Sequence, residues 1–299
     1  MTDSAVKSTL FSGLGRMISA EFLKLRKRSL TRVLLFILAG IIALVNLLLL
    51  AISKVNPPAG NGQGISNLGN LLGLSSAVPF ALSLMASFGV ALAIVLAASS
   101  MGNEYNWKTI RPALISSESR FKFLTSKLIS IALMILIGMT AGVVVGIVMS
   151  LITNGIGGYT YDFSFLTGDF VWQQFLQFGR TFFTIVPYAL LGFMMSIVGR
   201  SAMPGIATGI AVVFLEGVVT AFMRLAGGWI AKVPDYLLNA NVQAITALNE
   251  LPRGFGRMGV GTTGDTAPTA MHAYITLGVY ALAFLVFAYY LFRKRDVTV

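Results

Sequence analysis

The sequence predicts an all-α integral membrane protein with six transmembrane helices, and two observations lead to this fold class. Of the 299 residues, 56% are hydrophobic and only 11% are charged, whereas about a quarter are charged in ordinary soluble domains. Six stretches are also continuously apolar over the roughly 20 residues that a helix needs to cross a bilayer, while barrel strands would alternate between apolar and polar residues. The predicted spans are residues 33–52, 78–101, 128–152, 181–198, 203–223 and 273–292.

The segment before the first span, residues 1–32, predicts an amphipathic helix. Its apolar residues recur every three or four positions and are accompanied by basic ones; the apolar residues are Phe11, Leu14, Ile18, Phe22 and Leu25. Such a helix would lie along the inner leaflet with its cations near anionic headgroups. A positively charged anchor for the first span fits this pattern equally well.

The spans form one transmembrane domain, residues 33–292, whose connections differ in character. Residues 199–202 predict a tight turn between the fourth and fifth spans. The segment 153–180 begins with glycines and becomes aromatic near Trp172, which is typical of residues that anchor a helix at the membrane interface, although a ligand cage would use the same residue types. The outer segment 224–272 contains a predicted short helix at 235–248, and residues 293–299 form a tail.

The distribution of basic residues predicts the orientation of the spans. On the side of the N-terminus lie 16 of the 22 Lys and Arg residues, and cytoplasmic segments carry such an excess. We therefore expect a multi-pass protein of the plasma membrane with both termini in the cytoplasm. Because topology explains the net charge of +11, the charge does not indicate nucleic acid as a partner.

Small residues follow one another at four-residue spacing in three of the predicted spans. Examples are Gly138, Gly142 and Gly146 in the third span and Gly205 and Gly209 in the fifth. Small residues at this spacing let two helices approach closely. The pattern favours packing inside the chain over a seam between two copies, and it does not say which helices meet.

The sequence lacks the signatures of an enzyme. There is no cysteine and only one histidine, His272, which excludes thiolate sites and a histidine-rich metal site within one chain. No phosphate-binding loop of the Gly-x-x-x-x-Gly-Lys-[Ser/Thr] type occurs either. We expect no catalytic residue, metal or cofactor in this chain.

Two polar residues fall inside predicted spans. Glu216 lies deep in the fifth span, where a carboxylate must be paired, hydrated or protonated. It would either face a substrate path or make a structural hydrogen bond to a neighbouring helix. Asn46 in the first span carries the same two interpretations.

The segment 102–127 is a charged and aromatic island between two long apolar runs. It contains Tyr105, Trp107, Lys108 and Arg111, and it leads through Arg120 into the third span. Aromatic residues together with Arg are favoured at protein interfaces. The island therefore predicts a docking element for a cytoplasmic protein, or alternatively an interfacial membrane anchor.

The pattern of this island resembles the permease subunits of the type-two ABC exporter family. In that family a Glu opens the loop after the second helix, a Thr follows five residues later, and a Ser-Arg pair and a Lys lead into the third helix. The matching residues are Glu104, Thr109, Ser119, Arg120 and Lys127. The chain differs at Lys108, where a Gly usually precedes the Thr, and at Glu118, where a Pro is common. The basic stretches 21–28 and 292–296 also resemble segments of this permease family.

The resemblance implies a half-transporter that forms the substrate path with a second permease, either a copy or a homologue. Two cytoplasmic ABC ATPase subunits would bind ATP and Mg²⁺, and the loop would couple them to the membrane path through a short helix around 104–111. The residues implied in coupling are Glu104, Tyr105, Trp107, Lys108, Thr109, Arg111 and Arg120, and those near the path are Glu216 and Asn46.

Two other functions are also compatible with the sequence. A secondary carrier would use Glu216 and an ion gradient, and a membrane anchor would tether a cytoplasmic protein without transporting anything. The sequence identifies neither the transported substrate nor the choice between a homodimer and a heterodimer.

Overall fold

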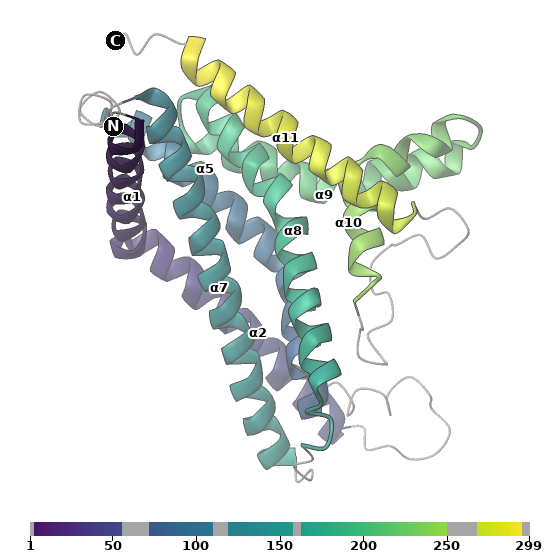
Figure 1. The fold of residues 1–299 in the computed structure, drawn as a ribbon. Helices are drawn as coiled ribbons and strands as arrows, with labels where there is room; N and C mark the ends of the chain where they lie inside the picture. The colour runs from purple at the N-terminus through teal and green to yellow at the C-terminus, as the bar shows by residue number, and fades with distance from the viewer. Residues whose placement is uncertain (1–2, 56–71, 110–118, 158–162, 250–267, 295–299) are drawn as a thin grey trace.

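The computed structural model is helical and contains no strand within the residues that it describes, which are 3–55, 72–109, 119–157, 163–249 and 268–294. The helices in chain order are α1 (Asp3–Lys27), α2 (Ser29–Val55), α4 (Ala77–Leu84), α5 (Val90–Asn106), α7 (Arg120–Gly157), α8 (Gly168–Gly199), α9 (Ala202–Ala226), α10 (Leu238–Thr246) and α11 (Ala270–Lys294) (Figure 1). Short 3-10 helices, η1 (Leu74–Ser76) and η3 (Ile230–Tyr236), and a π-helix, η2 (Met85–Gly89), complete the described structure.

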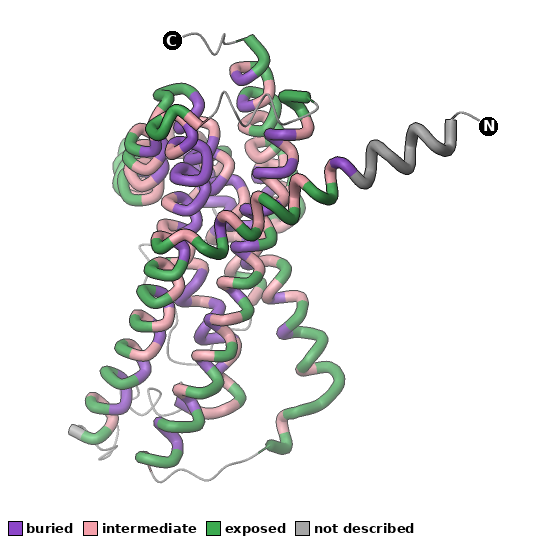
Figure 2. The backbone as a smooth tube through the Cα atoms, turned by 90° about the vertical axis from the view of Figure 1, so that its left-hand side faces the viewer, coloured by how far each residue is buried: buried purple, intermediate pink, exposed green. Residues whose placement is uncertain are grey.

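Among the described residues, six helical segments are long and apolar enough to cross a membrane, as predicted. They are Ser29–Lys54, Leu74–Asn106, Arg120–Gly157, Gly168–Gly199, Ala202–Ala226 and Ala270–Lys294. Their outer surfaces carry large apolar residues that are mostly exposed, such as Phe36 in α2 and Phe222 in α9. Figure 2 shows such exposed positions along the long helices. A surface of this composition is suited to lipid rather than water.

The structural helices extend beyond the predicted spans, most of all at the fourth. We predicted that this span begins at Thr181, but α8 begins at Gly168. Thr167 caps the helix, because its side-chain oxygen accepts a hydrogen bond from the Phe170 N–H at 3.2 Å. The aromatic residues that we assigned to a connection therefore form the first turns of α8. Hydropathy marks the part of a helix that is apolar, and a helix can continue past it.

Helices α5, α8 and α9 pack closely on one another. Glycines make this approach possible. A Cβ atom on Gly102 of α5 would lie 2.2 Å from the Ala202 backbone nitrogen, and one on Gly205 of α9 would lie 2.4 Å from the Gly192 carbonyl oxygen of α8. The small residues of the fifth span thus serve packing inside the chain, as the sequence favoured.

The turn between α8 and α9 is as tight as predicted. Helix α8 ends at Gly199 and α9 begins at Ala202. Arg200 adopts a left-handed conformation with φ of 51°, and the Ser201 N–H donates to the Ser196 carbonyl oxygen at 3.2 Å. This turn places the start of α9 against the end of α5.

Helix α1 runs across the long helices, whereas α2 runs along α7 (Figures 1 and 2). The segment that we predicted as an amphipathic helix is helical, from Asp3 to Lys27. Leu25 is buried, and Phe22 and Met17 pack against the hydrophobic core. The Ser130 hydroxyl of α7 donates to the Ile18 carbonyl oxygen at 3.2 Å. One side of α1 is thus fixed to α7 at the end of the bundle where α5 also ends.

The predicted short helix of the outer segment is partly correct. Residues 230–236 form η3, and α10 covers 238–246 within the predicted range. Helix α10 packs against α11, α8 and α9. Arg180 of α8 donates to the Leu248 carbonyl oxygen at 2.9 Å, which fixes the end of this segment.

Candidate functional site

The charged island of the sequence begins inside α5 rather than after it. Glu104 lies in the last turn of this helix, and Trp107 to Thr109 form the turn that ends it. The expected separate short helix around 104–111 is therefore not found among residues 104–109, because α5 continues through Asn106. Arg111 lies outside the described residues.

The end of α5 has the hydrogen-bond pattern of a Schellman motif. The Lys108 N–H donates to the Tyr105 carbonyl oxygen at 3.1 Å, and the Thr109 N–H donates to the Glu104 carbonyl oxygen at 3.0 Å. This motif requires a left-handed residue after the helix, usually Gly. Lys108 occupies that position with φ of 55°. The turn thus keeps the geometry that a Gly would give, although the residue differs from the pattern of the resemblance.

The Glu104 carboxylate is completely buried and has four side-chain partners. One oxygen, Oε1, accepts from the ammonium groups of Lys24 and of Lys127, the latter at 3.0 Å, and lies 3.5 Å from the Arg28 guanidinium. The other oxygen, Oε2, accepts from the Thr109 hydroxyl at 2.5 Å. Because Lys24 and Arg28 border the α1–α2 corner and Lys127 belongs to α7, this carboxylate joins three parts of the chain.

Lys127 extends the network to a second carboxylate. Its side chain is also fully buried, and its ammonium group donates to Glu21 Oε2 at 2.9 Å and to the Ser100 carbonyl oxygen at 3.4 Å. We call the set Glu21, Lys24, Arg28, Glu104, Thr109 and Lys127 the junction. It contains three cations and two carboxylates. Buried charges persist in a protein when they are paired and hydrogen-bonded, as these are.

Trp107 lies on the outside of the junction. Its side chain is 60% exposed, and the Arg28 guanidinium lies 5.1 Å from the centre of its ring, within the range of a cation–π contact. Lys108 beside it is exposed, and Tyr105 is half-buried against the core. An exposed aromatic ring on a rigid support is a feature of protein-binding surfaces.

The remaining candidate of the island, Arg120, lies at the start of α7. It is exposed, and its guanidinium donates to the Arg293 carbonyl oxygen in α11 at 3.4 Å. The structure therefore brings Glu104, Thr109 and Lys127 into one network, and it places Trp107 and Lys108 on its surface. Arg120 instead links α7 to the last helix.

Sequence reasoning missed the junction residues Glu21, Lys24 and Arg28 as partners of Glu104. We interpreted them as part of an amphipathic or anchoring segment. The available signal was the scarcity of acids: a Lys at position 127, bordering an apolar run, needs a carboxylate, and only eleven exist in the chain. Nothing in the sequence indicated which of these carboxylates would pair with Lys127.

The two candidate path residues lie in different parts of the structure. Glu216 in α9 is 9% exposed, and its Oε1 accepts from the Asn239 N–H in the first turn of α10 at 2.6 Å. This is the structural hydrogen bond to a neighbouring helix that the sequence left open. Asn46 in α2 is buried, and its amide donates to the Ile42 carbonyl oxygen one turn earlier. The principal contacts of α2 are with α7 and those of α9 are with α8 and α5.

The described side chains offer no site for a metal ion, since no three His, Asp or Glu residues among them lie close enough to share one. His272 instead contacts the connection before α10. Its Nε2 lies 3.1 Å from the Asp235 carbonyl oxygen, and its ring packs edge-on against Tyr236.

Comparison with known proteins gives a family and a distant relative. The chain is 27% identical over 212 residues to "Uncharacterized protein YhcI" of Bacillus subtilis (strain 168). The match covers 68% of this chain and 63% of the relative, so the chain spans less than two thirds of that protein's length. A family model described as "Protein of unknown function (DUF2705)" matches residues 64–298, which include Glu104, Trp107 and Glu216. The chain belongs to this DUF2705 family.

Proposed function

We propose that this chain is the membrane permease subunit of an ATP-driven exporter, and that Trp107 and its surroundings dock a cytoplasmic ATPase. A second permease, either a copy or a homologue, completes the path. ATP and Mg²⁺ bind the ATPase and not this chain. The observation that carries the proposal is that an exposed aromatic residue, Trp107, lies directly on the buried ionic network of the junction.

The junction is suited to passing a displacement from a partner into the membrane helices. Trp107 contacts Arg28, and Arg28 and Lys24 contact the Glu104 carboxylate of α5. Glu104 in turn is paired with Lys127 of α7. A push on Trp107 therefore acts on α1, α5 and α7 together.

The orientation in this proposal places the junction and both termini in the cytoplasm and the chain in the plasma membrane. The support is the excess of Lys and Arg on the side of the junction. Helix α1 then lies at the inner leaflet, with its buried side on α7 and its basic residues toward the headgroups. The outer segment with α10 faces the opposite side.

Glu216 has a structural role in the proposal. An ion-coupled carrier would need this carboxylate to exchange partners, and it already accepts a short hydrogen bond from the start of α10. We therefore favour the ATP-driven mechanism over the secondary carrier. The non-transporting anchor differs from the permease by its outcome in a transport assay.

The test is first whether an ATPase of this kind is encoded beside this chain, and then reconstitution of the two proteins together. We expect the two proteins to co-purify, and we expect Trp107→Ala to weaken the complex and to abolish the stimulation of ATP hydrolysis. The matched control is Trp229→Ala, because Trp229 is 76% exposed but lies in the outer segment. A complex that forms without moving any substrate would favour the anchor. Equal behaviour of the two variants would refute docking at Trp107.

A further inference from the structure

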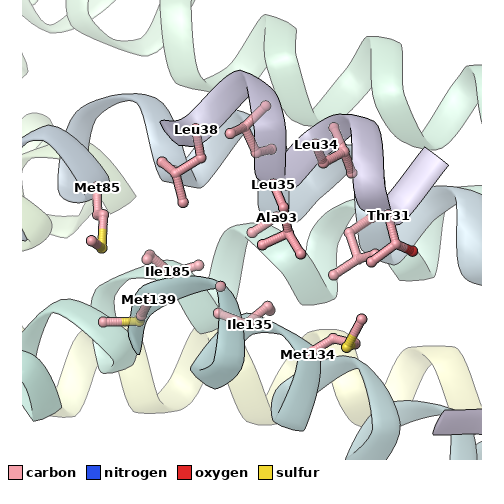
Figure 3. Close-up of a pocket in the computed structure, with 14 residues that line it drawn as sticks. Thr31, Leu34, Leu35, Leu38, Met85, Ala93, Met134, Ile135, Met139 and Ile185 are labelled. Atoms are coloured by element: carbon pink, nitrogen blue, oxygen red, sulfur yellow. The ribbon is translucent and has the colours of Figure 1, made fainter. Parts of the chain in front are cut away.

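A pocket lies between α2, α5, α7 and α8 (Figure 3). Its lining consists of Leu, Ile, Met, Ala and Gly residues, and Thr31 brings the one hydroxyl group. The cavity itself has a volume of about 60 Å³, and the space grows to about 500 Å³ when its open side is included, so the pocket is a groove and not an enclosed cavity. Gly138 has no side chain to fill the pocket from α7. A Cβ atom at this position would contact only Leu35, at 3.6 Å.

The pocket lies within the candidate membrane spans. Figure 3 shows Leu34 and Leu38 of α2 opposite Ile135 and Met139 of α7. From Thr31 to Leu38 it extends over two turns of α2, which is roughly 10 Å at the rise of a helix. Methionine side chains adapt readily to flexible apolar ligands, and Met85, Met134 and Met139 all line this space.

One end of the pocket adjoins a concentration of positive charge. Residues 24–32 contain five basic side chains and no acidic one. Arg28 is engaged with Glu104 and Trp107. Arg32 is exposed, and its guanidinium donates to the Lys27 carbonyl oxygen at 2.9 Å, so that both residues lie at the α1–α2 corner. The Thr31 hydroxyl at this end is buried and has no hydrogen-bond partner among the described residues.

We propose that the pocket binds one acyl chain of an anionic membrane phospholipid, whose phosphate is held by Lys27 and Arg32. The apolar lining fits a hydrocarbon chain, and because the open pocket is lined by residues of the candidate spans, we expect the ligand to enter from the membrane. The basic corner selects a headgroup with a net negative charge over a zwitterionic one. The lipid is a resident ligand at the α1–α2 corner, and α9, which carries Glu216, lines no part of its site.

This inference does not depend on the proposed function, because lipid binding needs neither an ATPase nor transport. The full chain is reconstituted in vesicles of phosphatidylcholine that contain a trace of a photoactivatable lipid. The probe has a diazirine in its acyl chain and either a phosphatidylglycerol or a phosphatidylcholine headgroup. After illumination, peptide mass spectrometry locates the label.

We expect the phosphatidylglycerol probe to label the peptide that contains Met134 and Met139 and to be displaced by unlabelled phosphatidylglycerol. Gly138→Leu fills the pocket and should abolish this label. Gly40→Leu is the matched control, because Gly40 lies on the exposed side of α2 with no atom within 4 Å of its Cβ position. The two variants thus introduce the same leucine side chain, once into the pocket and once on the exposed surface of α2.

The headgroup is tested separately. The double variant Lys27→Gln and Arg32→Gln should lower phosphatidylglycerol labelling roughly 30-fold, as two basic residues near an anionic headgroup predict, and should leave phosphatidylcholine labelling unchanged. The control is Lys54→Gln with Lys232→Gln, since both lysines are exposed and lie outside the corner. Equal labelling by the two probes in the unmodified chain, label spread over the outer helix surfaces, or normal labelling of Gly138→Leu would each overturn the proposal.

Discussion

Replacing Glu104 by Gln should destabilise the protein strongly while keeping the shape of the side chain. The substitution removes one of the two carboxylates in the junction and leaves Glu21 to balance three cations. Gln can still accept a hydrogen bond from Thr109. The effect therefore measures the buried charge and not the volume of the side chain.

The size of the effect follows from the burial of the partners. Removing one member of a buried ion pair costs about 3–5 kcal/mol, because the other charge stays buried without compensation. Lys127 is fully buried and cannot move into solvent, but it keeps Glu21 at 2.9 Å. Lys24 is 37% exposed and can turn outward. We therefore expect a loss near the lower limit, about 3 kcal/mol.

Reversible unfolding of the purified chain in mixed detergent micelles, followed by tryptophan fluorescence, measures this loss. A double-mutant cycle with Lys127→Met isolates the pair, since the double variant removes both buried charges. If each single variant loses about 3 kcal/mol, the double variant should lose well under the sum, with a coupling energy of about 2 kcal/mol. Asp169→Asn, at an exposed acid, should cost less than about 1 kcal/mol. Additive losses, or a cost of Glu104→Gln no larger than that of the control, would refute the ionic junction.

Three further predictions concern single positions. Gly102→Ala should cost about 3 kcal/mol in the same unfolding assay, because the new methyl group would lie 2.2 Å from the Ala202 backbone nitrogen; Gly15→Ala, with open space around it, should cost nothing. Lys108→Gly should raise the free energy of unfolding by about 1 kcal/mol, since Gly adopts the left-handed conformation without strain, and an unchanged or lower stability would contradict the Schellman turn. Glu216→Gln should weaken the anchoring of α10 by about 1–2 kcal/mol, seen as faster hydrogen exchange of the amides of residues 239–242, whereas exchange in α8 should not change.

The spanning helices could be predicted because they depend on local composition. An apolar run of about 20 residues has few alternatives to a helix in a bilayer, and the turn at 199–202 is short enough to allow only a hairpin. Helix α8 begins 13 residues before the predicted span, since its first turns carry Gln174, Gln177 and aromatic side chains in place of a continuous apolar run. Capping by Thr167 decides where this helix begins, and hydropathy does not register a cap.

The sequence predicted where the candidate site lies, but it did not predict which residues pair with one another in it. The sequence pointed to Glu104, Thr109 and Lys127, which do meet in the structure. It could not pair them with Glu21 and Lys24, because contacts between residues about 80 to 106 positions apart depend on how α1 crosses the bundle. Charge excess predicts that a basic segment lies on one side of a membrane, but it does not identify the carboxylate that will hold it.

Two carboxylates on the long helices contact the peripheral helices of this protein, Glu104 through cationic side chains and Glu216 through a backbone N–H. Glu104 of α5 binds side chains from the end of α1 and the α1–α2 corner, and Glu216 of α9 binds the first turn of α10. In a bilayer, apolar packing distinguishes poorly between a neighbouring helix and lipid, since both are apolar. A buried carboxylate has no such equivalent alternative, because leaving it unpaired in a low-dielectric surrounding is costly. The position of each peripheral helix is therefore set in part by a buried carboxylate, and the replacement of that carboxylate should loosen the helix that it contacts.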